Sequence, residues 1–163
     1  MLEMAILVSL LPHFNSSIEG GYMLNTIQVI LEPMALMPTK SHEDDAGYDL
    51  YSPCMAIIPA HKRAVIDTGV CVDIPKGYYA RLESKSGLMR DKGITVRGTI
   101  DSGYRGTIKV VLFNHSDESV TFERGDKITQ IVFLKCESPE LKTVTSFEGE
   151  TDRGENGFGS TGK

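Results

Sequence analysis

Short runs in which apolar and polar residues alternate follow one another along the chain from residue 26 onward. Alternation with a period of two places every second side chain on one face, which is the pattern of a strand with one buried face. Turn-forming residues separate the runs, as at Ile74–Gly77 and Glu123–Asp126. The runs that we expect to be strands cover residues 26–31, 56–58, 64–66, 70–72, 78–82, 107–113, 119–122 and 128–134.

The spacing of these runs indicates the fold class. Short strands at regular intervals, joined by turns, are typical of a β-sandwich, a jelly roll or a barrel. No window of the sequence keeps a helical period, and residues 87–92 are the one place where we expect a short helical turn. The sequence shows no internal repeat and no second domain.

The two ends of the chain depart from this pattern. Residues 4–11 form an apolar run of about eight residues, far short of the ~20 that span a bilayer, and no Lys or Arg precedes it as in a secretory signal. We therefore expect residues 1–22 to be a leader or extension outside the functional unit, residues 23–148 to form the β domain, and no membrane association. Residues 149–163 are Gly-rich and polar, which predicts a flexible C-terminal segment.

Composition and charge narrow the classes of function. The chain has 163 residues, of which 40% are hydrophobic and 24% charged, as in a single globular domain. A net charge of −5 disfavours a general nucleic-acid binder, although a few local cations suffice for a small polyphosphate. The three cysteines and four histidines are scattered, which gives neither a disulfide framework nor a zinc site and suits a reducing compartment.

Five polar clusters interrupt the strands, and the first two have residue types suited to phosphate chemistry. The cluster Ala46–Ser52 contains Asp49, which taken alone reads as a solvated carboxylate at a turn entering a strand. The cluster Ser84–Leu88 has a cation, a hydroxyl and a glycine in succession, which together can contact a phosphate. A surface turn is an equally good interpretation of this second cluster.

The third cluster, Gly98–Gly106, has a glycine at each end, which predicts a tight hairpin. The tip of a hairpin can present backbone N–H and C=O groups to the edge of a planar base. Asp101 could orient an attacking water there, and the ring of Tyr104 could pack against a sugar. The alternative is an ordinary β-turn with Asp-Ser-Gly chemistry.

The last two clusters lie in the final third of the chain. Arg124–Gln130 predicts a hairpin turn followed by a core strand, in which Gln130 is an unexpected polar residue. In Arg153–Lys163, glycines can wrap the backbone around anionic oxygens, hydroxyl groups can donate to them, and Phe158 can stack on a base. This segment also spells GxxxxGK, but a P-loop needs a preceding strand and a following helix, so we do not assign one. A disordered tail is the alternative.

In this order and at these spacings, the five clusters resemble the five motifs of the trimeric dUTPase family, and the resemblance runs from about residue 26 to residue 163. It implies an all-β, jelly-roll-like β-barrel (β-clip) subunit in a homotrimer with a C-terminal flap. One subunit would provide the first, second and fourth motifs, a neighbour the third, and the remaining subunit the fifth. The resemblance further implies hydrolysis of dUTP to dUMP and pyrophosphate with Mg²⁺ on the triphosphate, in the cytoplasm or, in a eukaryotic or viral setting, the nucleus.

The resemblance also implies a role for each site residue. Asp101 would activate the water that attacks the α-phosphorus, help that is typically worth about 10²–10⁴-fold in rate. Tyr104 would pack under the deoxyribose and exclude a 2′-hydroxyl, backbone groups around residues 95–100 would read the uracil edge, and Asp49 would act on Mg²⁺ through waters. The expected substrate-binding residues are Lys85, Ser86, Gly87, Thr95, Gly98, Thr99, Ile100, Tyr104, Lys109, Gln130, Arg153, Phe158, Gly159, Ser160 and Thr161.

Three residues depart from the common family pattern, and two rival functions stay open. Lys85 stands where Arg is usual, which keeps the charge but loses the bidentate fork. Glu83 adds a carboxylate near the expected triphosphate, and Gly103 stands where a second Asp is usual. The rivals are a dCTP deaminase-like member of the same fold, whose cytosine-protonating residues the sequence does not identify, and a non-catalytic nucleotide-binding regulator.

Overall fold

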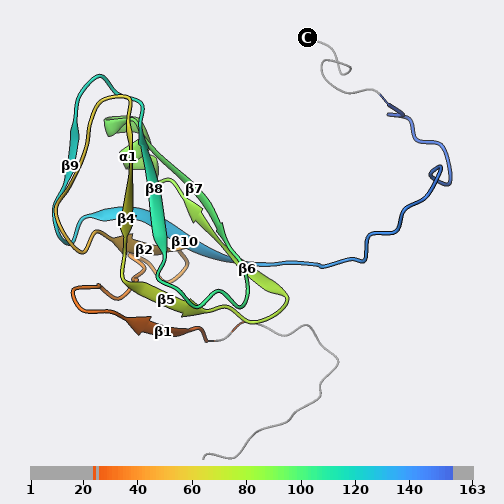
Figure 1. Cartoon of the computed structure of the whole chain (residues 1–163), viewed down its shortest axis with the longest axis horizontal. Coiled ribbons are helices and arrows are strands. Elements are labelled where there is room, and N and C mark those ends of the chain that lie inside the picture. The colour runs from red at the N-terminus through yellow and green to blue at the C-terminus, as the bar shows by residue number, and fades with distance from the viewer. Residues whose placement is uncertain (1–23, 25, 156–163) are drawn as a thin grey trace, which may run out of the picture.

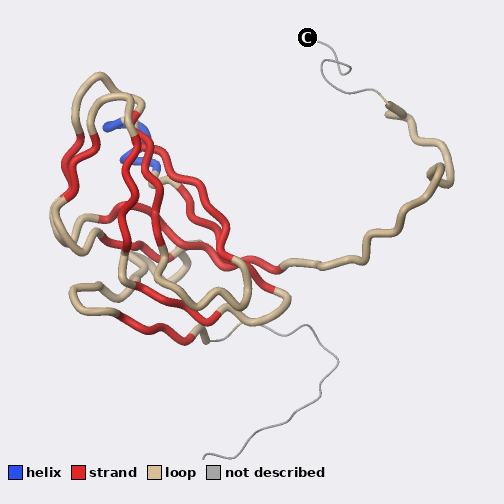
Figure 2. Tube along the Cα trace, in the orientation of Figure 1, coloured by secondary structure: helices blue, strands red, loops and turns tan. Residues whose placement is uncertain are grey.

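A six-stranded sheet in the order β2-β10-β6-β7-β8-β4 makes up the largest part of the fold in the computed structural model, which describes residue 24 and residues 26–155. The sheet curls around a hydrophobic core, and two smaller two-stranded sheets, β1-β5 and β3-β9, cover the rest of this core (Figures 1 and 2). The strands are β1 (Gln28–Leu31), β2 (Tyr48–Tyr51), β3 (Ala56–Ile58), β4 (Arg63–Asp67), β5 (Val70–Asp73), β6 (Tyr78–Glu83), β7 (Ile94–Ile100), β8 (Lys109–Asn114), β9 (Val120–Phe122) and β10 (Lys127–Lys135).

Alternation along the strands explains how the core forms. In β8, residues 110, 112 and 114 are buried while their neighbours are more exposed, and β5 and β6 show the same alternation. Burying one Val, Leu or Ile side chain is worth about 1.5–3 kcal/mol, so these inward rows supply the main stabilisation. The expectation of an all-β, jelly-roll-like barrel is therefore confirmed. Within the described residues the one helix is α1 (Ser86–Lys92), close to the helical turn expected at 87–92.

Asn114 is a polar exception within this core. Its side chain is 2% exposed, yet its amide donates to the carbonyl oxygens of Ile58, Pro59 and Glu118 at 2.7–3.2 Å. Its own side-chain oxygen accepts from the backbone N–H of Ser116 at 2.9 Å. Buried polar groups are tolerated when they are fully hydrogen-bonded, and here one amide joins the end of β8 to the segments around β3 and β9.

The prediction of a tight hairpin at Gly98–Gly106 is wrong. β7 and β8 are antiparallel neighbours, but they pair only from Ile94↔Asn114 to Val96↔Leu112. Beyond that point the end of β7 stays with β6, through Ala80↔Ile100, while the backbone of Ile108 bonds to Val70 at 2.8 Å. Because each strand keeps a different partner, the two diverge and residues 101–108 form a wide loop.

The alternating runs did not include β2 or β7, although the first cluster was interpreted as a turn entering a strand. In β7, the alternation Ile94-Thr95-Val96-Arg97 is broken by Gly98, which lies against Leu82: a Cβ at Gly98 would come within 3.3 Å of the Leu82 Cδ1 atom. The glycine therefore serves close packing between β6 and β7 and not a hairpin turn.

Residues 137–155 leave the body after β10 and run away from it without strand or helix (Figure 1). The side chains of Leu141 and Phe147 are 94% and 91% exposed there. The domain boundary at residue 148 stays a prediction, and the predicted leader, residues 1–22, lies outside the described residues. Within the described part of the chain, no helix is both long and apolar enough to cross a membrane.

Candidate active site

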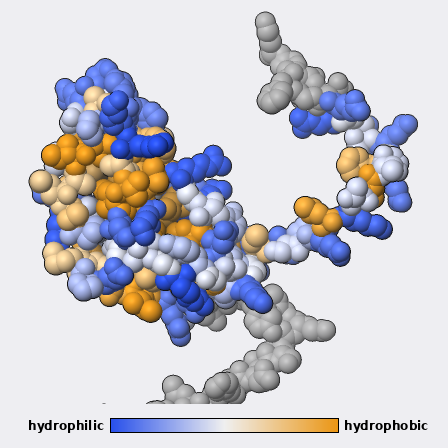
Figure 3. Space-filling view, in the orientation of Figure 1, coloured by the Kyte–Doolittle hydropathy of each residue, from blue (hydrophilic) through white to orange (hydrophobic). Residues whose placement is uncertain are grey.

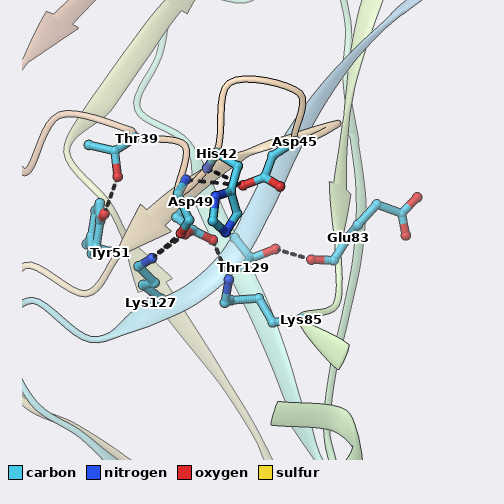
Figure 4. A network of polar contacts seen from close by, with 10 residues as sticks. Thr39, His42, Asp45, Asp49, Tyr51, Glu83, Lys85, Lys127 and Thr129 are labelled. Atoms are coloured by element: carbon cyan, nitrogen blue, oxygen red, sulfur yellow. Dashed lines mark hydrogen bonds and ion pairs between the residues drawn. The ribbon is translucent and has the colours of Figure 1, made fainter. Parts of the chain in front are cut away.

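Asp49 in β2 is the centre of a polar cluster formed by the first, second and fourth motifs (Figure 4). Its side chain is only 8% exposed, and each carboxylate oxygen faces one lysine. Lys127 at the start of β10 donates to Oδ2 at 2.7 Å, and Lys85, between β6 and α1, donates to Oδ1. A carboxylate read from the sequence as a solvated side chain is thus a buried, doubly paired charge.

A β-bulge brings Lys127 and Gln130 to this cluster together. The pairing of β10 with β2 shifts register between residues 127 and 129, so that Lys127 pairs with Tyr51 and Gln130 with Asp49. Side chains three residues apart point to opposite faces of a regular strand, and one extra residue restores them to the same face. Sequence reasoning missed Lys127 because regular alternation places it on the face opposite Gln130.

The pKa of Asp49 lies below its ordinary value, and two opposing effects decide it. Burial of the carboxylate on its own would raise the pKa, because it disfavours the charged form. The hydrogen bonds and positive charges of Lys127 and Lys85 outweigh burial and lower it. In turn, the hydrogen bond that Lys127 donates to Asp49 raises the pKa of Lys127. Asp49 and Lys127 are therefore both charged near neutral pH.

Beside this cluster, the second motif offers two exposed groups. Ser86 and Gly87 open α1, and a Cβ at Gly87 would meet no atom within 4 Å outside its own helix. The protein alone therefore does not require glycine at position 87, and the space in front of it is open to a ligand. Gln130 is partly buried, and its side-chain oxygen lies close to Gly47, where a Cβ would come within 3.2 Å of it.

The structure explains the unusual carboxylate at Glu83. Its side chain accepts a hydrogen bond from Arg81, two residues earlier on the same face of β6. Figure 4 shows it directed away from Asp49 and Lys85. Only its backbone oxygen joins the cluster, where it accepts from the hydroxyl of Thr129 at 2.8 Å. Glu83 pairs with Gln130 across β6 and β10, but its ion pair with Arg81 offsets the negative charge that it brings near the expected phosphates.

A second group of predicted residues surrounds the wide loop after β7. The side chain of Asp101 is exposed at the end of this strand. The hydroxyl of Tyr104 donates to the backbone oxygen of Thr107 at 3.0 Å, which folds the ring back over Gly106.

Lys109 lies 3.3 Å from the carboxylate of Asp67. Burial would raise the pKa of Asp67, but hydrogen bonds from Gly69, Thr107 and Lys109 and the charge of Lys109 lower it overall.

The backbone edge of β7 lies between the two groups. Its pairing with β8 stops at Val96, so the β8-facing edge of residues 97–100, which includes Gly98, Thr99 and Ile100, has no partner in that strand. Thr95 lies before this point, and its hydroxyl is 2.7 Å from the Nε2 atom of His115. The open edge is available to a ligand that presents donors and acceptors in one plane.

One chain does not bring the two groups together. Ile100 pairs with Ala80, so Asp101 lies beside Tyr79, six residues before Lys85 along the same strand direction. At about 3.3 Å per residue, this places Asp101 roughly 20 Å from Lys85. Of the flap residues, Arg153 is exposed in the tail, whereas Phe158, Gly159, Ser160 and Thr161 lie outside the described residues.

The donor set fits a hard cation that is held mainly by a substrate. Among the described residues there is no group of three or more His, Cys, Asp or Glu side chains that could hold a metal. Mg²⁺ commonly keeps several waters and uses one or two carboxylates together with substrate phosphates. Asp49, whose oxygens accept one lysine each, retains lone pairs for such waters, so an indirect role toward Mg²⁺ fits this residue.

Comparison with known proteins places the chain in a family. The family model dUTPase matches residues 34–162. The deoxyuridine 5′-triphosphate nucleotidohydrolase of Candida albicans is 44% identical over 80% of this chain and 84% of its own length, and that of Fowl adenovirus A serotype 1 is 43% identical over 82% and 75%.

Solved structures show the same relationship. The dUTPase of Staphylococcus bacteriophage 80alpha, solved with dUpNHpp, superposes with a TM-score of 0.81 at 34% identity, over 85% of this chain and 99% of that one. A point mutant of the dUTPase of Staphylococcus aureus phage phi11, whose structure reveals the coordination of a structural Mg(II) ion, superposes with a TM-score of 0.73 at 31% identity, over 77% of this chain and 100% of that one. The chain therefore belongs to the dUTPase family.

Proposed function

We propose that the chain is a dUTP diphosphatase, which hydrolyses dUTP to dUMP and pyrophosphate. The observation that carries the proposal is the meeting of Asp49, Lys85 and Gln130, from three separate motifs, on one face of the sheet, in a chain of the dUTPase family. A buried carboxylate flanked by two lysines and bordered by the exposed Ser86 and Gly87 has the charge and the open space that a triphosphate and its cation need.

The reaction requires one proton transfer and one bond exchange. Asp101, with its exposed carboxylate, accepts a proton from a water molecule as the water oxygen forms a bond to the α-phosphorus. The bond from the α-phosphorus to the oxygen bridging to the β-phosphorus breaks, and pyrophosphate leaves with that oxygen. Lys85, Ser86 and Gln130 hold the phosphates in line during the attack.

Recognition of the nucleoside belongs to the second group of residues. The open backbone edge of residues 97–100 offers donors and acceptors to the uracil edge. Tyr104, folded back over Gly106, packs under the deoxyribose and leaves no room for a 2′-hydroxyl. Arg153 and Phe158 of the flap clamp the phosphates and the base, with Gly159, Ser160 and Thr161 around the γ-phosphate.

Mg²⁺ is part of the same proposal. Asp49 would hold it indirectly, through water, and the ion would neutralise charge that develops on the departing pyrophosphate. The structural Mg(II) ion whose coordination the phi11 dUTPase structure reveals supports the choice of metal.

The active form is a homotrimer with shared sites. Two observations support it: the separation of roughly 20 Å between Asp101 and Lys85 along β6 and β7, and the apolar side chains on the surface of the body, among them Val65 at 60% and Phe113 at 39% exposure (Figure 3). Exposed apolar surface of this kind marks contact with another protein surface.

The deciding experiment is a pyrophosphate-release assay with Mg²⁺ across dUTP, dTTP, dCTP and UTP. We expect turnover of dUTP at a kcat/KM at least about 100-fold above each of the others, because dCTP presents a different base edge, UTP adds a 2′-hydroxyl and dTTP adds a 5-methyl group. Ammonia release from dCTP would support the deaminase instead. Tight dUTP binding without release of pyrophosphate would support the non-catalytic regulator.

A further inference from the structure

The carboxylate of Asp49 has two lysine partners where one would neutralise it. Lys127 contacts Oδ2 at 2.7 Å and Lys85 contacts Oδ1, so the two ammonium groups lie on different oxygens of one buried side chain (Figure 4). Leaving a buried charge without a partner is strongly unfavourable. With two partners, Asp49 can lose one and stay paired.

The two lysines differ in how firmly they are held. Lys127 also donates to the hydroxyl of Ser41 at 3.0 Å, which ties its ammonium to the loop before β2 as well as to Asp49. For the ammonium group of Lys85, the described part of the chain gives no hydrogen bond other than the one to Asp49. Lys85 adjoins the exposed Ser86 and Gly87, whereas Lys127 lies on the opposite side of the carboxylate (Figure 4). Lys85 is thus the partner that is free to turn toward a ligand.

We propose that Lys127 is a positioning residue that keeps Asp49 paired and in place, and so allows Lys85 to leave Asp49 for the triphosphate. The inference rests on the proposed function, because it takes Lys85 as a phosphate contact. Without Lys127, Asp49 would have Lys85 as its only cation, and the triphosphate would have to break a buried ion pair to recruit it. Binding of the triphosphate would then weaken although Lys127 itself need not touch it.

A double-mutant cycle separates this indirect role from direct attraction of the phosphates. Binding of dUpNHpp is measured by calorimetry in the presence of EDTA, for the full chain and for Lys127→Met, Asp49→Asn and the double variant. We expect Lys127→Met to weaken binding about tenfold in the natural background. In the Asp49→Asn background no carboxylate competes for Lys85, so the same change should alter binding by less than about twofold. A tenfold loss in both backgrounds would overturn the proposal, because direct attraction does not depend on Asp49.

Two further variants serve as controls. Lys127→Arg retains a cation that can pair with Asp49 and should bind dUpNHpp within about threefold of the natural chain. Lys135→Met removes one exposed lysine from the far end of the same strand and should leave binding unchanged. A loss with Lys135→Met equal to that with Lys127→Met would reduce the effect to net charge and overturn the proposal.

A measurement on the natural chain covers the case in which Asp49→Asn does not fold. The ammonium groups of lysines in ion pairs can be followed by ¹⁵N NMR. Addition of dUpNHpp should shift the Lys85 signal and leave that of Lys127 in place; a shift of Lys127 alone would contradict the exchange. If the natural chain does not bind dUpNHpp at all, the proposed function fails, whereas binding with additive effects in the cycle defeats only the role of Lys127.

Discussion

At the scale of single residues, Asp101 is the side chain whose loss is expected to stop the chemistry without stopping binding. It lies exposed at the end of β7, and replacement by Asn keeps its size while removing the basic oxygen. Proton abstraction of this kind is worth about 10²–10⁴-fold, so kcat of Asp101→Asn should fall by at least about 100-fold. The dissociation constant for dUpNHpp should stay within a few fold. Unchanged turnover, measured as pyrophosphate release, would refute the role of Asp101.

Asp49 predicts how stability depends on pH. Its pKa is lower in the folded chain than its ordinary value of 3.8, so the unfolded chain takes up protons first as the pH falls. The stabilisation is complete above that ordinary pKa and is lost as the pH falls through the lower, folded-state pKa. In urea denaturation, the free energy of unfolding should therefore decrease between about pH 5 and pH 2.

The variant Asp49→Asn provides the comparison for this pH dependence. It should be less stable at pH 7 by about 1–3 kcal/mol, because the lysines lose their charged partner. Its stability should also decline less steeply in acid, since one group with a shifted pKa has been removed. Asp67, whose pKa is lowered too, should maintain part of the slope. An acid profile parallel to that of the natural chain would show that Asp49 is not responsible.

At the scale of elements, the loop between β7 and β8 depends on Gly106. A Cβ at this position would lie 2.5 Å from the hydroxyl oxygen of Tyr104, so Gly106→Ala must displace the ring. The atom in the way is the far end of a side chain, so the chain should still fold. Displacement of the ring opens the space beside C2′ of the sugar, and the preference for dUTP over UTP, as a ratio of kcat/KM values, should fall by about tenfold or more.

Tyr104→Phe is the matched control for this change. It removes the hydroxyl that donates to Thr107 but keeps the ring, so most of the preference for dUTP should survive. Equal loss of discrimination in both variants would mean that the hydrogen bond, and not the position of the ring, excludes the ribose.

The strands differ in how well the sequence predicted them. Strands with clear alternation, such as β5 and β8, were predicted because every second residue is buried. β2 and β7 did not stand out as alternating runs because polar or glycine residues interrupt them, and only the first cluster was interpreted as a turn entering a strand. The tight hairpin was wrong because glycines identify a possible turn, whereas the partners of β7 and Ile108 are set by strands distant in sequence.

The residues of the candidate site were likewise predicted only in part. The resemblance named Asp49, Lys85 and Gln130, and the structure brings them together. Lys127 could not be recognised, because a bulge that the sequence does not reveal turns its side chain onto their face. Glu83 was a puzzle for a related reason: its pairing with Arg81 depends on strand geometry. Sequence therefore identified residue types, and strand register determined which of them meet.

At the scale of the whole molecule, the distance between Asp101 and Lys85 predicts complementation between subunits. Two inactive variants of the chain should restore activity when they form a trimer together. One chain carries Asp101→Asn and the other carries Lys85→Ala with Ser86→Ala, and each alone should be inactive. If every site takes Asp101 from one subunit and Lys85 from another, random mixed trimers contain sites in which both contributions are intact. With equal amounts of the two chains, about a quarter of the sites in all trimers should be of this kind, which is one site in each mixed trimer.

Co-expression of the two chains with different tags, followed by purification on both, isolates the mixed trimers for the pyrophosphate assay. Activity well above that of either variant alone is the expected result, because one site in each mixed trimer keeps both contributions. A third chain that lacks residues 153–163 extends the test, because mixed trimers should also supply it with a flap from a neighbour. The contrary result is that the mixed trimers stay as inactive as the two parent variants while each variant still binds dUpNHpp. The site would then lie within one subunit. In that case the tail or loop must move far enough to close the roughly 20 Å that separate Asp101 from Lys85 along β6 and β7.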